Sequence, residues 1–373
     1  MQTTLPTSKS STNTIKRVLS TKITLGGGDT QQLDGLNGLI QRLKSLEQYQ
    51  DIELNGNTIS SGTRECKSRW DAIKQHIPQR GVVLDLGSAE GYFSHRIARE
   101  FPEVLVLSFE KDTIRTNIQS IIFSMEGLTN VVVCQTAITP LEIARLASVV
   151  ETIDVIMALS FLHHLPTYQI PTFLTMTAHL TPVYIVEFPS PLEIGVCNYS
   201  AVERFEHIEE ILKRTYPSVV GIGNFRSHLD NNVQRKMWKA QRQSLTRKNL
   251  LPYMSAPIPF VRTHTLDFRD DKGWILDNSK KLKVGVNAWN LLHYNIVYPA
   301  SEWWQRNSVD SYKKLLEKGH NVTDVRPWNL IITPSGLEVI DSKDVPNEII
   351  ALRSDDVEKL AATFGKLKPQ FLW

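Results

Sequence analysis

Short apolar runs alternate with helix-like segments between residues 82 and 186, and this alternation constrains the fold more than any other feature. The runs are Val82–Leu86, Val104–Phe109, Val131–Cys134, Asp154–Leu159 and Val183–Val186. They are almost wholly apolar, which is typical of strands that are buried on both faces. Because the intervening segments suit right-handed crossover helices, the pattern predicts a doubly wound, Rossmann-like α/β sheet.

The segments around this block predict further elements. Leucine and isoleucine spacing predicts an amphipathic helix over residues 31–47, and a second helix is expected over 64–76. Residues 219–225 and 260–268 could form an antiparallel edge pair. Basic residues dominate 226–248, which suggests either a solvated basic helix, the simpler interpretation, or a docking surface for phosphate or another polyanion.

We therefore expect three parts. Residues 1–48 would form a mobile arm with the amphipathic helix, 49–270 the catalytic α/β domain, and 271–373 a C-terminal extension. With 42 basic and 39 acidic residues, the net charge of +3 does not by itself indicate a nucleic-acid-binding protein. There is no apolar run of the roughly 18–20 residues that span a membrane. Three scattered cysteines suggest a reducing compartment, so we expect a cytoplasmic protein, of unspecified oligomeric state.

The turn after the first predicted strand reads Gly87-Ser88-Ala89-Glu90-Gly91. Its glycines permit positive φ angles and a close approach by a ligand. The spacing differs from the Gly-x-Gly-x-x-Gly of dinucleotide sites, and Glu90 would repel a diphosphate. Glu110, at the end of the second strand, could accept the ribose hydroxyls of a nucleoside, and Asp85 could meet a cationic group. S-adenosylmethionine combines a nucleoside with a cationic amino-acid end and has no phosphate, so it is the expected cofactor.

Residues 83–94 resemble the first motif of class I S-adenosylmethionine-dependent methyltransferases. The resemblance extends over about residues 49–190 and implies a seven-stranded sheet. It also implies that Thr136 and Ala137 flank the adenine and that Leu159-Ser160-Phe161 lines the methionine side. The expected cofactor-binding residues are Tyr49, Arg64, Asp85, Gly87, Ser88, Gly91, Tyr92, Phe93, Glu110, Lys111, Thr136, Ala137 and Ser160.

Four further stretches are similar to the methyltransferase half of the bacterial O-antigen chain-terminating methyltransferase/kinase proteins. They are Tyr49-Gln50-x-Ile52, the segment 64–73, Leu159–His164 and Ile185-Val186-Glu187. That family methylates a phosphate at the end of a polysaccharide. The resemblance implies that Tyr49 and Arg64 close over the cofactor, with Arg64 at its carboxylate. The alternative is that Arg64 and Arg69 are surface charges of a helix.

Three residues follow the fourth and fifth strands, at the carboxyl edge of the sheet where such folds bind ligands. These candidate catalytic residues are His163, His164 and Glu187, and of the two histidines we favour His164. Imidazole is suited to act as a base or as a donor to an oxyanion. A hydroxyl acceptor would need a base, whereas an ionised phosphate would not.

The C-terminal part carries a second resemblance. Asp324-Val325-Arg326-Pro327-Trp328-Asn329 and Val339-Ile340-Asp341 resemble the catalytic loop and metal-binding Asp of kinase-like enzymes in the same family. Asp324 would be the base, and Asn329 and Asp341 the magnesium ligands. However, Val322 stands where the family has His, Ser342-Lys343 replaces Phe-Gly, and the segment is too short for two kinase lobes. A kinase-derived remnant is favoured over an active kinase.

These observations predict a methyltransferase that acts on an oxygen, of a phosphate or a hydroxyl, in a glycan or another anionic acceptor. Two alternatives remain open. One is an RNA methyltransferase acting on a cap or a terminal phosphate, which the basic segment and the N-terminal arm suggest. The other is a non-catalytic scaffold protein that retains the fold, because one fold can serve many functions.

Overall fold

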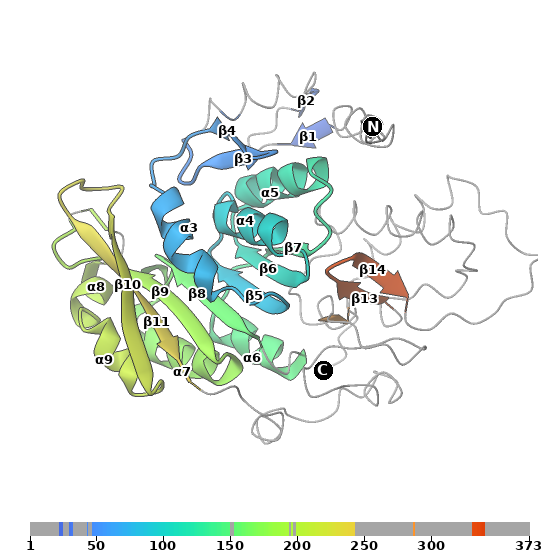
Figure 1. Ribbon diagram of the computed structural model, residues 1–373. Helices are drawn as coiled ribbons and strands as arrows, with labels where there is room; N and C mark the ends of the chain where they lie inside the picture. Colours follow the sequence, from blue (N-terminus) through green and yellow to red (C-terminus); the bar gives the residue numbers. More distant parts are fainter. Residues whose placement is uncertain are drawn as a thin grey trace, which may run out of the picture.

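The computed structural model describes residues 22–24, 30–32, 43, 47–149, 153–193, 195–196, 199–242, 286–287 and 330–339. A seven-stranded sheet forms the centre of this part of the chain, in the order β10-β11-β9-β8-β5-β6-β7 (Figure 1). Its strands are β5 Gly81–Leu86, β6 Val104–Glu110, β7 Val131–Gln135, β8 Val155–Leu159, β9 Val183–Phe188, β10 Ser218–Arg226 and β11 Gln234–Gln241.

Strands β5 to β9 run parallel, whereas β11 is antiparallel to both β9 and β10. The order differs from the dinucleotide-binding order 3-2-1-4-5-6 by the insertion of β11 between the last two strands. Every residue of β5, β6 and β8 (Val155–Leu159) is buried, as expected for strands covered on both faces. The predicted doubly wound sheet of seven strands is therefore confirmed.

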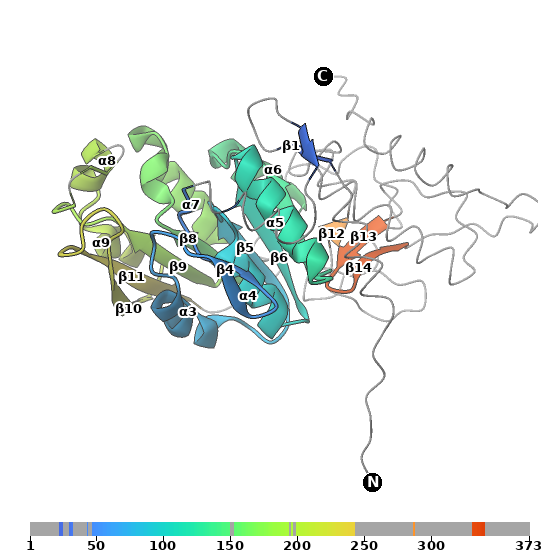
Figure 2. The same ribbon diagram turned by 90° about the horizontal axis from the view of Figure 1, so that it is seen from above.

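Helices cover both faces of this sheet (Figures 1 and 2). One face carries α3 Lys67–Ile73, α4 Tyr92–Glu100 and α5 Thr113–Met125, and the other carries α6 Pro140–Val149, α7 Ile170–Leu180 and α9 Ile208–Lys213, with α8 Tyr199–Arg204 nearby. Asp112 caps α5 by accepting a hydrogen bond from the backbone N–H of Arg115 at 3.0 Å. A 3₁₀ turn, η1 Lys74–His76, extends α3, so the helix predicted over 64–76 is confirmed in its main part.

The described part of the basic segment, residues 226–242, does not form the solvated helix of the simpler interpretation. Residues 234–241 are β11, which pairs with β10 along Ser218–Arg226. The first strand of the predicted edge pair is confirmed as β10, which lies at the edge of the described sheet and takes its described partner from the basic segment. The second predicted strand, 260–268, lies outside the described part of the chain, so that pairing stays a prediction. Within β11, Arg235 and Met237 are buried while Lys236 is exposed, which is the alternation of a strand rather than a helical pattern.

Smaller elements surround the sheet. A hairpin of β3 Ile52–Leu54 and β4 Asn57–Ser60 precedes α3. Strands β1 Lys22–Thr24 and β2 Thr30–Gln32 pair, so the helix predicted over residues 31–47 starts too early. Between residues 33 and 46 only Leu43 is described, and it is helical. Strands β12 Val286–Asn287, β13 Leu330–Thr333 and β14 Gly336–Val339 form a separate sheet. Thr129 donates its hydroxyl to the carbonyl of Pro334 at 2.8 Å. The three-part division itself stays a prediction.

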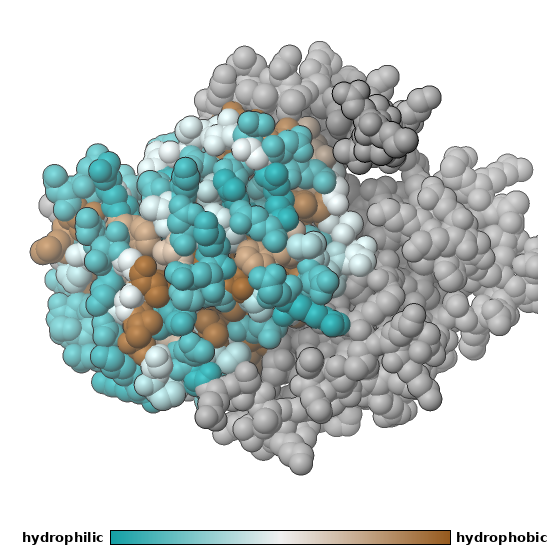
Figure 3. All heavy atoms as spheres, in the orientation of Figure 1, coloured by the Kyte–Doolittle hydropathy of each residue, from teal (hydrophilic) through white to brown (hydrophobic). Residues whose placement is uncertain are grey.

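The face of the molecule in Figure 3 is mainly hydrophilic, with small scattered hydrophobic areas. In the part of the chain that the structure describes, no helix combines the length and the apolar character needed to cross a bilayer. Cys66 and Cys134 are buried free thiols, and their burial raises the pKa of each thiol.

Candidate functional site

The loop between β5 and α4 turns by means of left-handed backbone conformations. Its φ angles are +71° at Gly87, 52° at Ala89 and +87° at Gly91. A Cβ atom added at Gly87 would lie 2.8 Å from Cδ2 of Phe161, so a larger residue there meets both strain and a neighbour. The loop is thus pressed against the segment that follows β8.

Most backbone N–H groups of this loop donate hydrogen bonds within the chain. The N–H groups of Gly87 and Ser88 both donate to the carbonyl of Phe109 at 2.9 Å, and that of Gly91 donates to the carbonyl of Ser88 at 2.8 Å. The first N–H of α4, at Tyr92, donates to the side-chain oxygen of Gln50 at 3.0 Å. Since a phosphate at a helix N-terminus needs free N–H donors, this geometry disfavours a diphosphate ligand, as the motif spacing predicted.

Glu110 lies beside the loop at the end of β6 and is buried. Its Oε2 accepts from the N–H of Ala89 at 3.0 Å, and its Oε1 accepts from the N–H of Asp112 at 2.9 Å. A carboxylate has about four lone-pair sites, so two sites remain for a ligand. The carboxylate is therefore held in place by the backbone and can still accept two hydroxyl groups.

A row of buried polar side chains supports the loop from below. Ser94 donates to Asp85 Oδ2 at 2.7 Å, Ser94 and Ser108 hydroxyls are 2.9 Å apart, and Ser108 donates to Gln119 at 2.8 Å. Gln119 then donates to the hydroxyl of Ser88 at 2.9 Å. Burial raises the pKa of Asp85 to about 6, although the Ser94 hydrogen bond and the charge of Arg64 oppose the rise. A cationic ligand group beside this carboxyl would therefore lower its pKa.

Glu90, which was expected to repel a diphosphate, also has a structural role. Its carboxylate accepts the backbone N–H of Tyr49 at 3.1 Å and of Gln50 at 3.0 Å, and it pairs with Arg115 at 3.3 Å. The ring of Tyr49 lies 5.3 Å from the guanidinium of Arg64 and 4.8 Å from the ring of His228. The segment before β3 is therefore held by hydrogen bonds against the loop after β5, next to the turn between β10 and β11.

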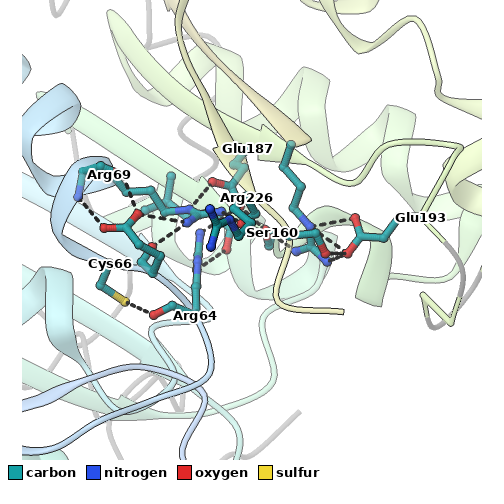
Figure 4. A network of polar contacts seen from close by, with 12 residues as sticks. Arg64, Cys66, Arg69, Ser160, Glu187, Glu193 and Arg226 are labelled. Atoms are coloured by element: carbon teal, nitrogen blue, oxygen red, sulfur yellow. Dashed lines mark hydrogen bonds and ion pairs between the residues drawn. The ribbon is translucent and has the colours of Figure 1, made fainter. Parts of the chain in front are cut away.

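Glu187, at the carboxyl end of β9, is the centre of a buried ion-pair cluster (Figure 4). Its carboxylate lies 2.9 Å from Nη2 of Arg64 and 2.6 Å from Nε of Arg69. Burial raises its pKa, but the two guanidinium charges and the hydrogen bonds from Arg69 and Ser160 outweigh burial and hold the pKa at about 2. Arg64 and Arg69 are both buried, so the alternative of helix-surface charges is wrong.

A second buried pair adjoins this cluster. Glu193 accepts from Nε of Arg235 at 2.8 Å and also from its Nη2. Nη1 of Arg235 donates to the hydroxyl of Ser160 at 2.8 Å, and that hydroxyl donates to Glu187 at 2.5 Å. The two pairs are therefore one network, which joins α3, the ends of β8 and β9, and β11.

Three buried guanidinium groups belong to this network, those of Arg64, Arg69 and Arg235. Their carboxylate partners are the buried Glu187 and Glu193 and the partly exposed Glu65, which lies 3.6 Å from Arg69. However, the buried Nε of Arg64 has no hydrogen-bond partner among the described residues. Because an unpaired buried donor is unfavourable, the site favours an acceptor, such as an anionic ligand group, at Arg64.

The two histidines after β8 lie in a 3₁₀ turn, η2 Leu162–His164, with ring centroids 4.1 Å apart. His163 is buried, and burial followed by the positive charges of His164 and Arg235 lowers its pKa to about 2. His164 is exposed, and its pKa is also lowered, first by partial desolvation and then by Lys111 and Arg235. Both imidazoles are therefore neutral near pH 7.

The predicted residues fall into two groups along the carboxyl edge of the sheet. Thr136 donates its N–H to the carbonyl of Glu110 at 3.0 Å, which places it, the exposed Ala137 and the exposed Lys111 next to that strand end. The other group surrounds Arg64 and includes Ser160, Glu187 and Phe93, whose ring lies 5.5 Å from the Arg64 guanidinium. Tyr92 instead packs against Arg96 at 5.5 Å. Asp324, Asn329 and Asp341 lie outside the described residues.

Sequence reasoning missed the roles of Arg235, Glu193 and His228. Arg235 was counted among the surface charges of the basic segment, although its period-two alignment with the apolar Met237 could have indicated an inward position. Glu193 and His228 carry no such signal, because each lies in a segment between regular elements. Only the pairing of β11 with β9 brings Arg235 to the site.

No family model matches the sequence, and no curated protein matches it. Among solved structures, the chain is similar to the bifunctional kinase-methyltransferase WbdD, with 16% identity and a TM-score of 0.46 over 81% of each chain. It is also similar to the N-terminal domain of EvdMO1 with SAH and D-fucose, with 16% identity, a TM-score of 0.41, and coverage of 56% of this chain and 97% of that one.

A SAM-dependent methyltransferase from Aquifex aeolicus gives 15% identity and a TM-score of 0.35, with 46% of this chain and 87% of that chain covered. At 15–16% identity and TM-scores below 0.5, these likenesses carry no conclusion about the activity of this protein. The seven-stranded sheet itself is the sheet that the motif resemblance implied.

Proposed function

We propose that this protein is an S-adenosylmethionine-dependent methyltransferase that acts on an oxygen of a glycan phosphate, a hydroxyl or another anionic acceptor. The observation that carries the proposal is the pair of complementary ends of the site. A fixed carboxylate, Glu110, with free acceptor capacity lies at one end, and a buried arginine cluster with the unpartnered Nε of Arg64 lies at the other. When bound, the cofactor supplies a methyl group on a positively charged sulfur.

The adenosine end rests on Glu110 and its neighbours. Glu110 would accept the two ribose hydroxyls, while Thr136 and Ala137 would lie against the adenine and Lys111 at its edge. Most of the loop amides are already used within the chain, which favours a nucleoside without a phosphate. Gly87, Ser88 and Gly91 shape this surface, since a Cβ atom at Gly87 would meet Phe161, one at Gly91 would meet Gln119, and both would strain the turn.

The methionine end rests on charge. Arg64 would hold the carboxylate of the cofactor through its free Nε, and a guanidinium is well suited to such a contact. Asp85, whose charge acts on Arg64, would balance the ammonium group. Tyr49 would close over the cofactor from its position beside Arg64, and Phe93 would support Arg64 from below. Ser160 would contribute its backbone, because its hydroxyl is engaged on both sides.

We assign the candidate catalytic residues different roles. Glu187 is held by two guanidinium groups at a pKa of about 2, so it positions Arg64 and does not serve as a base. His164, which is exposed and neutral, is the better candidate to accept a proton from a hydroxyl acceptor, and buried His163 would support it. An ionised phosphate acceptor would need alignment with the methyl group but no base.

The alternatives gain no support from the fold. The RNA hypothesis drew on the basic segment, yet Arg235 there is buried in an ion pair and Lys236 pairs with Glu209 at 2.9 Å. The cytoplasmic location and the interpretation of residues 271–373 as a kinase remnant stay predictions.

Calorimetry with S-adenosylhomocysteine tests the proposal directly. We expect saturable 1:1 binding, and at about 100 times the dissociation constant the ligand should stabilise the fold by roughly 2.7 kcal/mol. Transfer of a labelled methyl group to phosphorylated glycans, with RNA assayed in parallel, then identifies the acceptor. If neither heat of binding nor thermal stabilisation is observed, the proposed function is wrong; methylation of RNA alone would overturn the acceptor class.

A further inference from the structure

Ser160, the first residue after β8, adopts a backbone conformation that residues with a Cβ atom rarely take. Its φ is 59°, in the left-handed region. The other described residues of this kind, glycine apart, are Asn55, in the turn of the β3–β4 hairpin, and Ala89, in the loop after β5. Strain of this kind persists where the surroundings enforce it, and it collects at functional sites.

Three hydrogen bonds enforce the conformation of Ser160. Its N–H donates to the carbonyl of Glu187 at 2.9 Å, and its hydroxyl donates to the Glu187 carboxylate at 2.5 Å. The same hydroxyl accepts from Nη1 of Arg235 at 2.8 Å. The strained turn is therefore fixed from β9 on one side and from β11 on the other.

Arg235 is itself fixed by Glu193. Nε of Arg235 lies 2.8 Å from Glu193 Oε2, and Ser227 donates its hydroxyl to the same carboxylate. Arg235 is 2% and Glu193 0% exposed, so both charges are removed from water. A buried ion pair contributes little net stability over well-packed apolar residues, which indicates that this pair is present for its geometry. The neighbouring pair of Lys236 with Glu209 is, in contrast, partly exposed to solvent.

We infer that the Glu193–Arg235 pair is a positioning device that holds the Ser160 turn in the shape required by the amino-acid end of the cofactor. The inference rests on the proposed function and adds two residues to it. Neither residue is catalytic, because the charged groups of both are engaged with each other, with Ser160 and with Ser227. The device acts on one end of the cofactor only, since Glu110 and the loop after β5 take no part in it.

A comparison of two ligands tests this localised effect. S-adenosylhomocysteine has the amino-acid end, whereas 5′-methylthioadenosine has the same nucleoside and sulfur without it. We expect Arg235→Gln and Glu193→Gln to weaken S-adenosylhomocysteine binding at least about tenfold, or about 1.4 kcal/mol. The affinity for 5′-methylthioadenosine should change less than about twofold. Lys236→Gln, the matched control on β11, should change neither affinity.

Ser160→Ala tests the inference even if the first two variants fail to fold. It removes the hydroxyl link but leaves the Glu193–Arg235 pair intact, and it should produce the same selective loss of S-adenosylhomocysteine affinity. Circular dichroism and thermal unfolding establish that each variant is folded. Equal weakening of both ligands, or unchanged affinity for S-adenosylhomocysteine in folded variants, would overturn the inference alone. A wild-type protein that binds neither ligand would overturn the proposed function together with the inference.

Discussion

The two ends of the proposed cofactor site are built in different ways. The end at β5 and β6 is made from one short stretch of chain, Gly87–Gly91, together with Glu110, and it depends on backbone conformation and backbone hydrogen bonds. The end at β8 and β9 joins side chains from distant segments, with 123 residues between Arg64 and Glu187 and 75 between Ser160 and Arg235. Its contacts are made mainly by charged side chains, with one another and with serine hydroxyls and backbone carbonyls.

The difference shows that local interactions shape one end of the site and long-range interactions shape the other. A loop of small residues can be shaped by its own sequence and by the strand beside it. A cluster of buried charges exists only when the whole sheet is assembled, because each charge would be strongly destabilised without its partner. We therefore expect loss of the central carboxylate Glu187 at the second end to affect folding most, and loss of Glu110 at the first end to affect binding more selectively.

Glu187→Gln should produce the largest change. It leaves Arg64 and Arg69 buried without their carboxylate, so the free energy of unfolding should fall by about 3–5 kcal/mol in denaturant titrations. Asp71→Asn, which removes the exposed Asp71–Lys74 pair on α3, is the control and should leave the unfolding midpoint unchanged. Equal effects of the two substitutions would remove the proposed contrast between the ends.

Gly87→Ala should have the next largest effect and lower the free energy of unfolding by about 2–4 kcal/mol, because strain at a positive φ adds to the contact with Phe161. Gly127→Ala is a matched control, since Gly127 has a φ of +66° but nothing within 4 Å of the added Cβ. It should report the strain alone, about 1 kcal/mol. Thermal or chemical unfolding measures both, and equal losses would show that the loop is not pressed against the segment after β8.

Glu110→Gln should weaken S-adenosylhomocysteine binding about 10–100-fold, or about 1.4–2.8 kcal/mol, because a charged acceptor for the ribose is lost. The fold should persist, since the remaining amide oxygen can still accept a backbone N–H. Glu110→Ala should weaken binding further, because the N–H groups of Ala89 and Asp112 then lose their acceptor as well. Calorimetry measures both variants, and unchanged affinity in the two would refute the adenosine end.

The smallest effect should be a pH dependence through Asp85. Burial raises the pKa of this carboxyl to about 6 in the free protein, and a bound ammonium group would lower it. Below about pH 6, binding must then release a proton, so affinity should fall by up to about tenfold per pH unit as the pH decreases. Asp85→Asn should remove this dependence. A wild-type affinity that is constant from pH 7 to pH 5 would contradict the role of Asp85.

Much of the sheet could be predicted from the sequence because its central strands are buried on both faces. The run Val104–Phe109 predicts β6 to within one residue, since a short continuous apolar run is typical of a strand that is buried on both faces. The pairing of β10 with β11 was not predicted, because β11 mixes Arg235 and Lys236 with apolar residues and so does not resemble a sheet strand. Edge pairing depends on tertiary contacts that such a pattern does not contain.

The same limit applies to the site. The glycine-rich turn and Glu110 are recognisable because their spacing along the chain is set by one βα unit. The partners of Arg64 are not, because nothing local to residue 64 indicates a carboxylate at residue 187. Arg69 and Arg235 have the same residue type as exposed surface arginines, and only the assembled sheet distinguishes them.

The insertion of β11 between β9 and β10 has a consequence for biosynthesis. A chain made from its N-terminus can bring Glu187 to Arg64 and Arg69 as soon as β9 emerges from the ribosome, since both cations precede it. Glu193 and Ser160, by comparison, must wait for Arg235. A nascent chain arrested between these two points would have a nearly complete nucleoside end and an unfinished opposite wall, so it would acquire its ligand only after translation has passed β11.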